Sequence, residues 1–271
     1  MAVQDPWRSQ ALQDELAAVW PGMVVCIESE LGSTNSTLMA RAREGPLEPT
    51  LLVAQHQTEG RGRLGRTWLS SPQDSLTFSV GVMMRPPAWA GLSLAVGVAV
   101  VEALVGPAPG PLGLKWPNDV WLRSPEPGHH KCGGILVETS GGGGASGERA
   151  CVVGVGLNIR RPDAVAQHDL SVQAAGLQDV LPQLSSADAL HRVAAPIVRA
   201  LAQFNREGLA PFLRRYAPHD LLDGLAVQTT SAATPGGVAC GVDAQGALRL
   251  RQITGEVVSL VSGEVSVRPV G

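Results

Sequence analysis

The sequence predicts an α+β protein in which helices flank a mixed β-sheet, with a small β-barrel at the C-terminal end. Three observations predict this fold class. Short apolar and alternating runs typical of strands fill the chain between residues 51 and 154. Apolar positions between residues 186 and 217 recur at the spacing of amphipathic helices. After Asp220 the sequence changes to short alternating runs with turn residues between them, which is typical of a small barrel.

The first fifty residues predict a helix, a strand and a second helix. Helical spacing predicts the first helix over Gln10–Val19, and Pro21 with Gly22 ends it. The apolar run Met23–Ile27 then predicts a strand. The polar segment 32–36 offers several N-cap residues for a helix over Thr37–Glu44.

The middle of the chain predicts a sheet and one buried helix. The apolar stretch Leu92–Val105 contains Ser93 and Glu102 and is shorter than the ~20 residues that span a bilayer, so we expect a buried helix. The glycine-rich segment 140–147 predicts a flexible hairpin connection. The expected strands are Leu51–Gln55, Ser75–Met84, Leu112–Trp116, Val120–Leu122, Gly134–Glu138 and Cys151–Gly154.

The C-terminal third predicts two helices and then the barrel. Amphipathic helices between Ser186 and Ala217 are expected to cover one face of the sheet. The change in pattern places a domain boundary between residues 1–221 and 222–271. The expected barrel strands are Leu225–Thr229, Val238–Val242, Ala247–Gln252, Val257–Leu260 and Glu264–Val267.

Composition narrows the class of protein. The chain of 271 residues is 44% hydrophobic, enough for a substantial core. Its formal net charge of -3 gives no reason to expect nucleic acid or an anionic membrane as a partner. The four cysteines are far apart, which predicts reduced and mostly buried thiols. The N-terminus does not resemble a signal peptide, so we expect a cytoplasmic protein.

The segment Gly60–Arg66, G-R-G-R-L-G-R, interleaves three arginines with three glycines. It matches the G-x-G-x-x-G dinucleotide motif, but no helix is predicted after it and no acidic residue follows at ~20 positions. A basic, glycine-rich loop can fold over a phosphate-bearing ligand. From this pattern alone, a solvated basic loop is an equally good interpretation.

Three further segments place polar groups beside predicted strands. Lys115–Asp119, K-W-P-N-D, presents a cation, an amide and a carboxylate at a turn. Lys131 precedes a predicted strand that begins with glycines, and Gly154–Ile159 places glycines and an asparagine at the end of another. The two glycine-containing strand ends predict a narrow ligand slot.

Taken together, these residues resemble the catalytic core of biotin protein ligases. The family patterns S-T-N, G-R-G-R-x-G-R, K-W-P-N-D, K-x-x-G-I-L-V-E and G-x-G-x-N occur here in the same order, and the resemblance covers roughly residues 22 to 271. It implies a class II synthetase-like core with an SH3-like C-terminal barrel. It also implies that the chain activates biotin with ATP and transfers it to a lysine of a biotin carboxyl carrier protein.

The resemblance assigns roles to individual residues. Lys131, Arg63 and Arg61 are the expected catalytic residues, and Asp119 is the expected Mg²⁺ ligand. The residues expected at biotin are Ser33, Thr34, Asn35, Gln57, Gly60, Arg61, Lys131, Gly134, Gly154 and Gly156. The residues expected at ATP are Arg63, Arg66, Trp68, Lys115, Asn118, Asp119 and Asn158.

The chain departs from the family pattern in two places. About 22 residues precede the first predicted strand, too few for a separate DNA-binding domain, so we expect a ligase that does not bind nucleic acid. Residues 160–185 contain no tryptophan, whereas some family members place one against adenine there, so the adenine contact is left open. A homodimer formed through a sheet edge is also left open.

Two alternatives compete with the ligase. Lipoate or octanoate transferases resemble biotin ligases in fold and also place a lysine near the acyl group, but the G-R-G-R and K-W-P-N-D pair favours biotin. A biotin-binding regulator without turnover would not need the phosphate-facing arginines. Their presence favours an enzyme.

Overall fold

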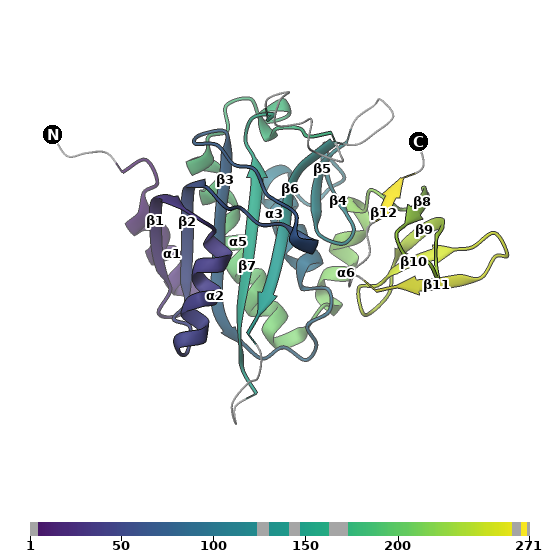
Figure 1. The fold of residues 1–271 in the computed structure, drawn as a ribbon, viewed down its shortest axis with the longest axis horizontal. Coiled ribbons are helices and arrows are strands. Elements are labelled where there is room, and N and C mark those ends of the chain that lie inside the picture. Colours follow the sequence, from purple (N-terminus) through teal and green to yellow (C-terminus); the bar gives the residue numbers. More distant parts are fainter. Residues whose placement is uncertain (1–4, 124–129, 141–146, 163–172, 262–266, 270–271) are drawn as a thin grey trace.

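The computed structural model describes residues 5–123, 130–140, 147–162, 173–261 and 267–269. Its main sheet has seven strands in the order β1-β2-β3-β7-β6-β5-β4 (Figure 1). β1 and β2 are parallel and the other neighbours are antiparallel, which confirms the predicted mixed sheet. The strands are β1 Val24–Leu31, β2 Thr50–Gln57, β3 Ser75–Met84, β4 Leu112–Lys115, β5 Asp119–Leu122, β6 His130–Thr139 and β7 Arg149–Asn158.

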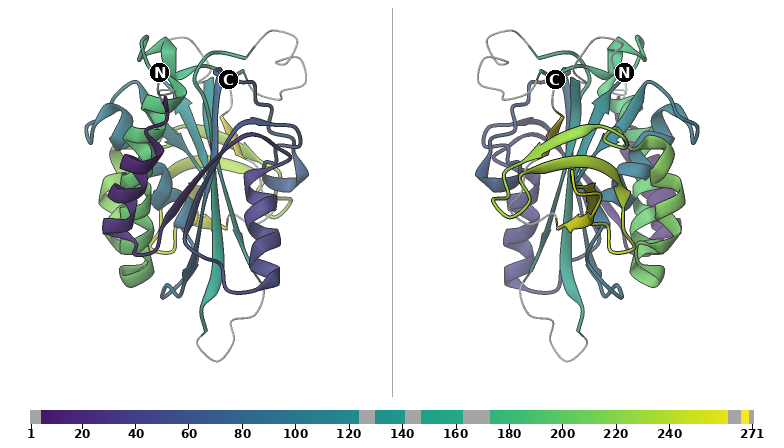
Figure 2. Two further views of the ribbon diagram at one scale, coloured as in Figure 1. Left: turned by 90° about the vertical axis from the view of Figure 1, so that its left-hand side faces the viewer. Right: turned by 90° about the vertical axis from the view of Figure 1, so that its right-hand side faces the viewer.

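Helices cover both faces of this sheet, as Figure 2 shows. α1, α3, α5 and α6 lie together on one face, where α5 packs against both α1 and α3. α2 lies alone on the other face, against β3 and β7. This uneven cover leaves room beside α2 for the segment between β2 and β3. The helices are α1 Ser9–Val19, α2 Thr34–Glu44, α3 Leu92–Val105, α5 Ser186–Glu207 and α6 Ala210–Tyr216.

α3 and α5 are buried to different degrees. α3 packs against β4, β5 and β6 of the sheet and against both α5 and α6. Ten of its fourteen residues are buried and apolar or small. The predicted amphipathic pattern of α5 corresponds to one buried stripe that contains Leu190, Ile197 and Phe204. Within the described residues, no helix is both long and apolar enough to cross a membrane.

The C-terminal segment forms a second, antiparallel sheet in the order β11-β10-β9-β8-β12. Pairing between its edge strands β11 and β12 is not seen among the described residues, so closure into a barrel stays a prediction. Its strands are β8 Ala226–Thr229, β9 Gly236–Val242, β10 Leu248–Arg251, β11 Val257–Leu260 and β12 Val267–Pro269.

The two sheets share one hydrophobic core. Trp116, which is fully buried, donates a hydrogen bond from Nε1 to the carbonyl oxygen of Gly246, at 3.0 Å. Val227, Leu248 and Val267 of the second sheet belong to the same buried cluster as the residues of the first. The domain boundary at residue 221 therefore stays a prediction, because the described core crosses it.

Two sequence predictions of local structure were wrong in a way that concerns the site. α2 begins at Thr34 rather than Thr37, because Ser33 is its N-cap and accepts a hydrogen bond from the backbone N–H of Ser36 at 3.3 Å. β6 and β7 also extend further than predicted, so Lys131 and the glycines lie within strands. Glycine weakens the strand signal in a sequence, but pairing on both sides satisfies the backbone. Residues 141–146 of the expected hairpin connection lie outside the described residues.

Candidate functional site

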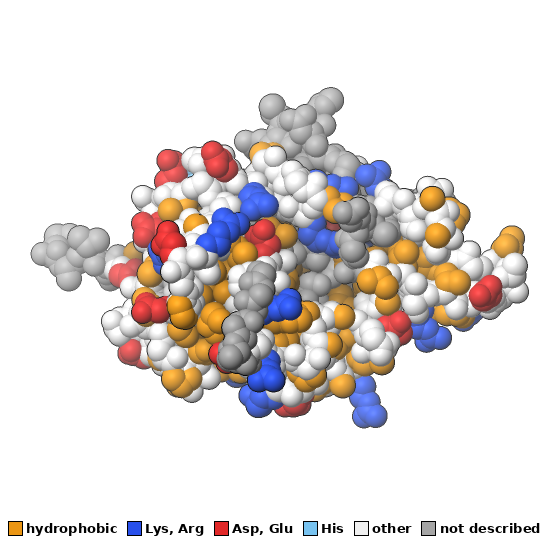
Figure 3. Space-filling view, turned by 60° about the horizontal axis from the view of Figure 1, so that its bottom comes forward, with side chains coloured by type: hydrophobic (Ala, Val, Ile, Leu, Met, Phe, Trp, Pro, Cys, Tyr) orange, Lys and Arg blue, Asp and Glu red, His pale blue; other side chains and the backbone are white. Residues whose placement is uncertain are grey.

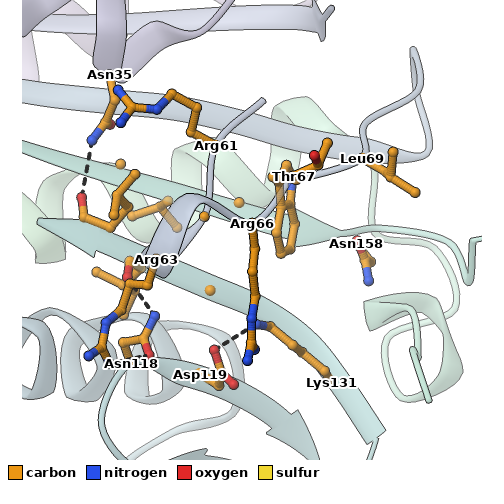
Figure 4. Close-up of a pocket in the computed structure, with 18 of the residues that line it drawn as sticks. Asn35, Arg61, Arg63, Arg66, Thr67, Leu69, Asn118, Asp119, Lys131 and Asn158 are labelled. Atoms are coloured by element: carbon orange, nitrogen blue, oxygen red, sulfur yellow. Dashed lines mark hydrogen bonds and ion pairs between the residues drawn. The ribbon is translucent and has the colours of Figure 1, made fainter. Parts of the chain in front are cut away.

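A cavity of about 210 Å³ lies on the α2 face of the main sheet (Figure 4). The start of α2 and the segment 61–69 form its walls, and β6 and β7 lie beneath it. Of the residues predicted to form the site, only Gly60 is absent from the lining; its backbone packs against that of Trp68. The sequence motifs, which lie up to 125 positions apart, therefore meet at one place.

The bottom of the cavity, here called the glycine floor, consists of Gly134, Gly154 and Gly156. Gly134 on β6 pairs directly with Gly156 on β7. The indole of Trp68 covers this pair, so a Cβ added to Gly156 would lie 2.5 Å from Trp68 Cε2. The absence of side chains lets a flat group lie directly on the backbone. Trp68, expected at ATP, lies over Gly134 and Gly156, which are expected at biotin.

One end of the cavity carries a network of buried neutral groups. The backbone N–H of Thr34 donates to Gln57 Oε1 at 2.7 Å, and the Thr34 hydroxyl donates to the same oxygen at 3.1 Å. Ser79 Oγ donates to Asn35 Oδ1 at 2.6 Å. These bonds fix the orientation of both amides in a buried environment. Sequence analysis missed Ser79, because a serine within an alternating strand carries no signal of its own.

The other end carries charge. Lys131 Nζ lies 2.7 Å from one oxygen of Asp119, and Lys115 Nζ lies 3.9 Å from the other. Burial alone would raise the pKa of Asp119, but the ammonium groups of Lys131 and Lys115 outweigh it and hold that pKa below its ordinary value. Burial lowers the pKa of Lys115 to about 8, although Asp119 acts in the opposite direction.

The segment Gly60–Trp68, here called the arginine loop, is an ordered turn over the cavity. Gly62 N–H donates to the carbonyl of Arg66 at 2.7 Å, and Trp68 N–H donates to that of Gly60 at 2.8 Å. The loop returns on itself and leads into β3, so it does not open the helix that a dinucleotide motif requires. The rejection of that motif from the sequence is confirmed.

The arginines of this loop point in different directions, as Figure 4 shows. Arg61 extends toward Asn35, and its Nη1 lies 3.5 Å from Glu138 Oε1. Arg63 Nη1 donates to Asn118 Oδ1 at 3.1 Å. Burial lowers the pKa of Arg63, and the charge of Asp119 partly offsets this effect. Arg66 extends toward Lys131 and Asp119.

The residues present do not fit a protein-bound Mg²⁺ at Asp119. Among the described lining residues Asp119 is the only carboxylate, and its oxygens face Lys131, Lys115 and the Nε1 of Trp121. The part of the chain that the structure describes contains no group of three acidic, histidine or cysteine residues able to hold a metal. The role of Asp119 as an Mg²⁺ ligand stays a prediction that this geometry does not support.

Some lining residues were not predicted. Val267 and Arg268 reach the cavity from β12 of the second sheet, and Pro162 and Ala174 also line it. The C-terminal sequence resembled the family pattern, but only the fold brings it beside the motifs of the first sheet. Residues 163–172, which include much of the segment expected near adenine, lie outside the described residues.

Comparison with known proteins shows the family to which the chain is related. The model of the biotin/lipoate A/B protein ligase family matches residues 31–158. A biotin-[acetyl-CoA-carboxylase] ligase of Mycobacterium tuberculosis is 32% identical over 97% of this chain and 96% of its own length. The bifunctional ligase/repressor BirA of Escherichia coli is 32% identical over 91% of this chain and 75% of its own.

Solved structures agree with the sequence relatives. The biotin protein ligase from Aquifex aeolicus, in complex with biotin and ATP, has a TM-score of 0.73 and 28% identity, over 91% of this chain and 99% of that one. The likeness therefore spans both sheets as well as the motifs. The chain belongs to the biotin protein ligase family.

Proposed function

We propose that this cavity activates biotin with ATP and then transfers the biotinyl group to a lysine of a biotin carboxyl carrier protein. The observation that carries the proposal is the glycine floor enclosed between a neutral amide end and a cationic end. Among the described lining residues six side chains are cationic, namely Arg61, Arg63, Arg66, Lys115, Lys131 and Arg268, against the one carboxylate of Asp119.

The first step needs this excess of positive charge. A carboxylate oxygen of biotin attacks the α-phosphorus of ATP, the bond from that phosphorus to the β-phosphate oxygen breaks, and pyrophosphate leaves. The two reactants are anions, so the site must neutralise them and hold them in line. In this proposal Lys131 contacts the biotin carboxylate, and Arg63 and Arg66 contact the phosphates; all three side chains line the cavity.

The second step needs protection from water. The amine of the carrier lysine attacks the acyl carbon of biotinyl-AMP, the acyl–oxygen bond breaks, and AMP leaves while the amine loses a proton. Until the carrier binds, water is a competing nucleophile. The arginine loop covers the glycine floor and is suited to exclude water from it.

We further propose that the chain works in the cytoplasm, where its cysteines, all free, would stay reduced. The expectations of a carrier from a carboxylase, of no nucleic-acid partner and of a homodimer stay predictions. The exposed edge strand β1 is where a dimer would extend the sheet.

The decisive experiment mixes the full chain with biotin, ATP, Mg²⁺ and an apo carrier domain, and measures the mass of the carrier. Lipoate is offered in a parallel reaction. We expect the mass gain of one biotinyl group with biotin and none with lipoate. No gain with biotin, or an equal gain with lipoate, would overturn the proposal.

A further inference from the structure

Glu138 on β6 lies outside the cavity but contacts two residues that line it. Leu136, two positions earlier on the same strand, lines the cavity, whereas Glu138 does not. The Glu138 side chain is 25% exposed, so it is mostly enclosed by its neighbours. Any effect of Glu138 on the reaction must therefore pass through the residues that it holds.

The two carboxylate oxygens of Glu138 contact two different walls of the cavity. Oε2 accepts a hydrogen bond from Asn35 Nδ2 at 2.9 Å, and Asn35 lies in the first turn of α2. Oε1 lies 3.5 Å from Nη1 of Arg61, which belongs to the arginine loop. One carboxylate thus joins the start of a helix to the arginine loop.

The contact with Asn35 determines which way its amide faces. The NH₂ group of Asn35 is directed at two acceptors, Glu138 Oε2 and the carbonyl of Leu136 at 3.3 Å. Its oxygen is therefore left to accept from Ser79. That oxygen also lies where a Cβ of Gly154 would be, so the amide has little room to turn. A carboxylate can only accept, and this keeps the network in one arrangement.

The contact with Arg61 restricts a long and mobile side chain. The Arg61 side chain is 52% exposed, and its Nη1 also donates to Ser36 Oγ at 3.4 Å. An exposed arginine populates many rotamers. The negative charge of Glu138 favours those that bring the guanidinium beside Asn35, which is the end of the cavity expected to hold biotin.

We propose that Glu138 is a positioning residue for biotin: it holds the Asn35 amide and the Arg61 guanidinium in the arrangement that biotin meets. The proposal rests on the function proposed above, because biotin is the ligand concerned. Among the described residues, the Glu138 carboxylate contacts Asn35 and Arg61 rather than Asp119, Lys115 or Lys131, so ATP binding should depend on it far less.

The test substitutes Glu138→Gln in the full chain, which keeps the size of the side chain and removes its charge. We expect the Kd for biotin, measured by calorimetry, to rise about tenfold, while the KM for ATP changes by less than about twofold. Glu30→Gln is the matched control, because Glu30 is a paired carboxylate on the same sheet, outside the cavity. An unchanged Kd for biotin would overturn the proposal. A fall in melting temperature, together with equal increases in the Kd for biotin and the KM for ATP, would also overturn the proposal, since that pattern indicates a structural role.

A double-mutant cycle tests the route through Asn35. If Glu138 acts through this amide, Glu138→Gln should raise the Kd for biotin by a smaller factor in the Asn35→Ala variant than in the parent. Equal costs in both backgrounds would overturn the proposed route. A parent that binds biotin without biotinylating the carrier would overturn the proposed function and leave this test valid, whereas a parent that binds no biotin would overturn both.

Discussion

Asp119 shows how a single carboxylate organises the charged end of the cavity. It is buried between two lysines, so its charge offsets the cost of burying theirs. Lys131, the residue predicted to contact the biotin carboxylate, has its Nζ 2.7 Å from an oxygen of Asp119. An arriving carboxylate would compete with Asp119 for the same ammonium group. Asp119 is thus the ion-pair partner of Lys131, a role that its place in K-W-P-N-D did not reveal.

Asp119→Asn should destabilise the fold in a pH-dependent way. At pH 7 the change leaves buried ammonium charge without its partner, at a cost of about 3 kcal/mol in the free energy of unfolding. Burial lowers the pKa of Lys115 in the folded chain to about 8, below its ordinary value of 10.5, so the unfolded chain binds more protons between those values and stability from this group rises with pH. The deficit of the mutant should therefore shrink as the pH rises from 7 to 10. Urea unfolding across this range would show it; a deficit that grows with pH would contradict the interpretation.

Substitution by alanine should affect stability differently at two glycines of the glycine floor. A Cβ on Gly154 would overlap the Asn35 amide oxygen, whereas the nearest atom to a Cβ on Gly134 is Lys131 Nζ at 3.5 Å, an ordinary contact. We expect Gly154→Ala to lower the free energy of unfolding by about 1–3 kcal/mol and Gly134→Ala to change it by about 0.5 kcal/mol or less. Both should weaken biotin binding if the ligand lies on the backbone. Urea unfolding and calorimetry separate the two effects, and equal stability losses would show that the steric argument fails.

At the scale of elements, the sequence predicted where helices and strands lie better than it predicted the residues at which they begin and end. The apolar periods of β3 and α3 gave their limits correctly, because both elements are almost wholly buried. The start of α2 was placed three residues late, since any of several polar residues could have been the cap. β6 and β7 were cut short at their glycines. The contributions of Ser79, Glu138 and Arg268 could not be predicted, because each depends on pairing between distant segments.

The arginine loop should retain the intermediate. Arg63 is partly buried against Asn118 and Asp119, where it would face the adenylate. We expect Arg63→Gly to leave a folded chain that releases biotinyl-AMP sooner, because one cation and the loop's attachment to Asn118 are lost. Release is measured by following labelled adenylate after removal of free ATP. Arg85→Gly, in an exposed loop outside the cavity, is the control. Equal retention by Arg63→Gly and the parent would contradict the prediction.

At the scale of the whole molecule, the two sheets behave as parts of one body. The described hydrophobic cluster crosses from one to the other, and Arg268 of β12 reaches the cavity of the first sheet. Hydrophobic side chains also lie on the surface toward the right of Figure 3. Val238, Ile253 and Val257, which belong to the C-terminal segment, are exposed. The second sheet therefore takes part in both the core and the site.

A shared core predicts a single unfolding transition, although the sequence suggests two domains. Trp116→Phe removes the hydrogen bond to Gly246 and leaves a buried carbonyl without that donor. We expect a loss of about 1–3 kcal/mol in the free energy of unfolding, with the transition still single. Scanning calorimetry would reveal a second transition if the sheets unfolded separately, and that result would favour the predicted boundary.

The pairing of β3 with β7 also has a consequence for how the chain folds. These strands are far apart in the sequence, and their pairing closes a long loop that contains α3, β4, β5 and β6. Closing such a loop costs chain entropy before any contact is gained, which slows folding. The glycine floor does not exist until β7 lies between β3 and β6. A ligand that binds only this finished surface stabilises the folded chain by mass action. Biotin bound on this floor would in this way raise the stability of the whole fold.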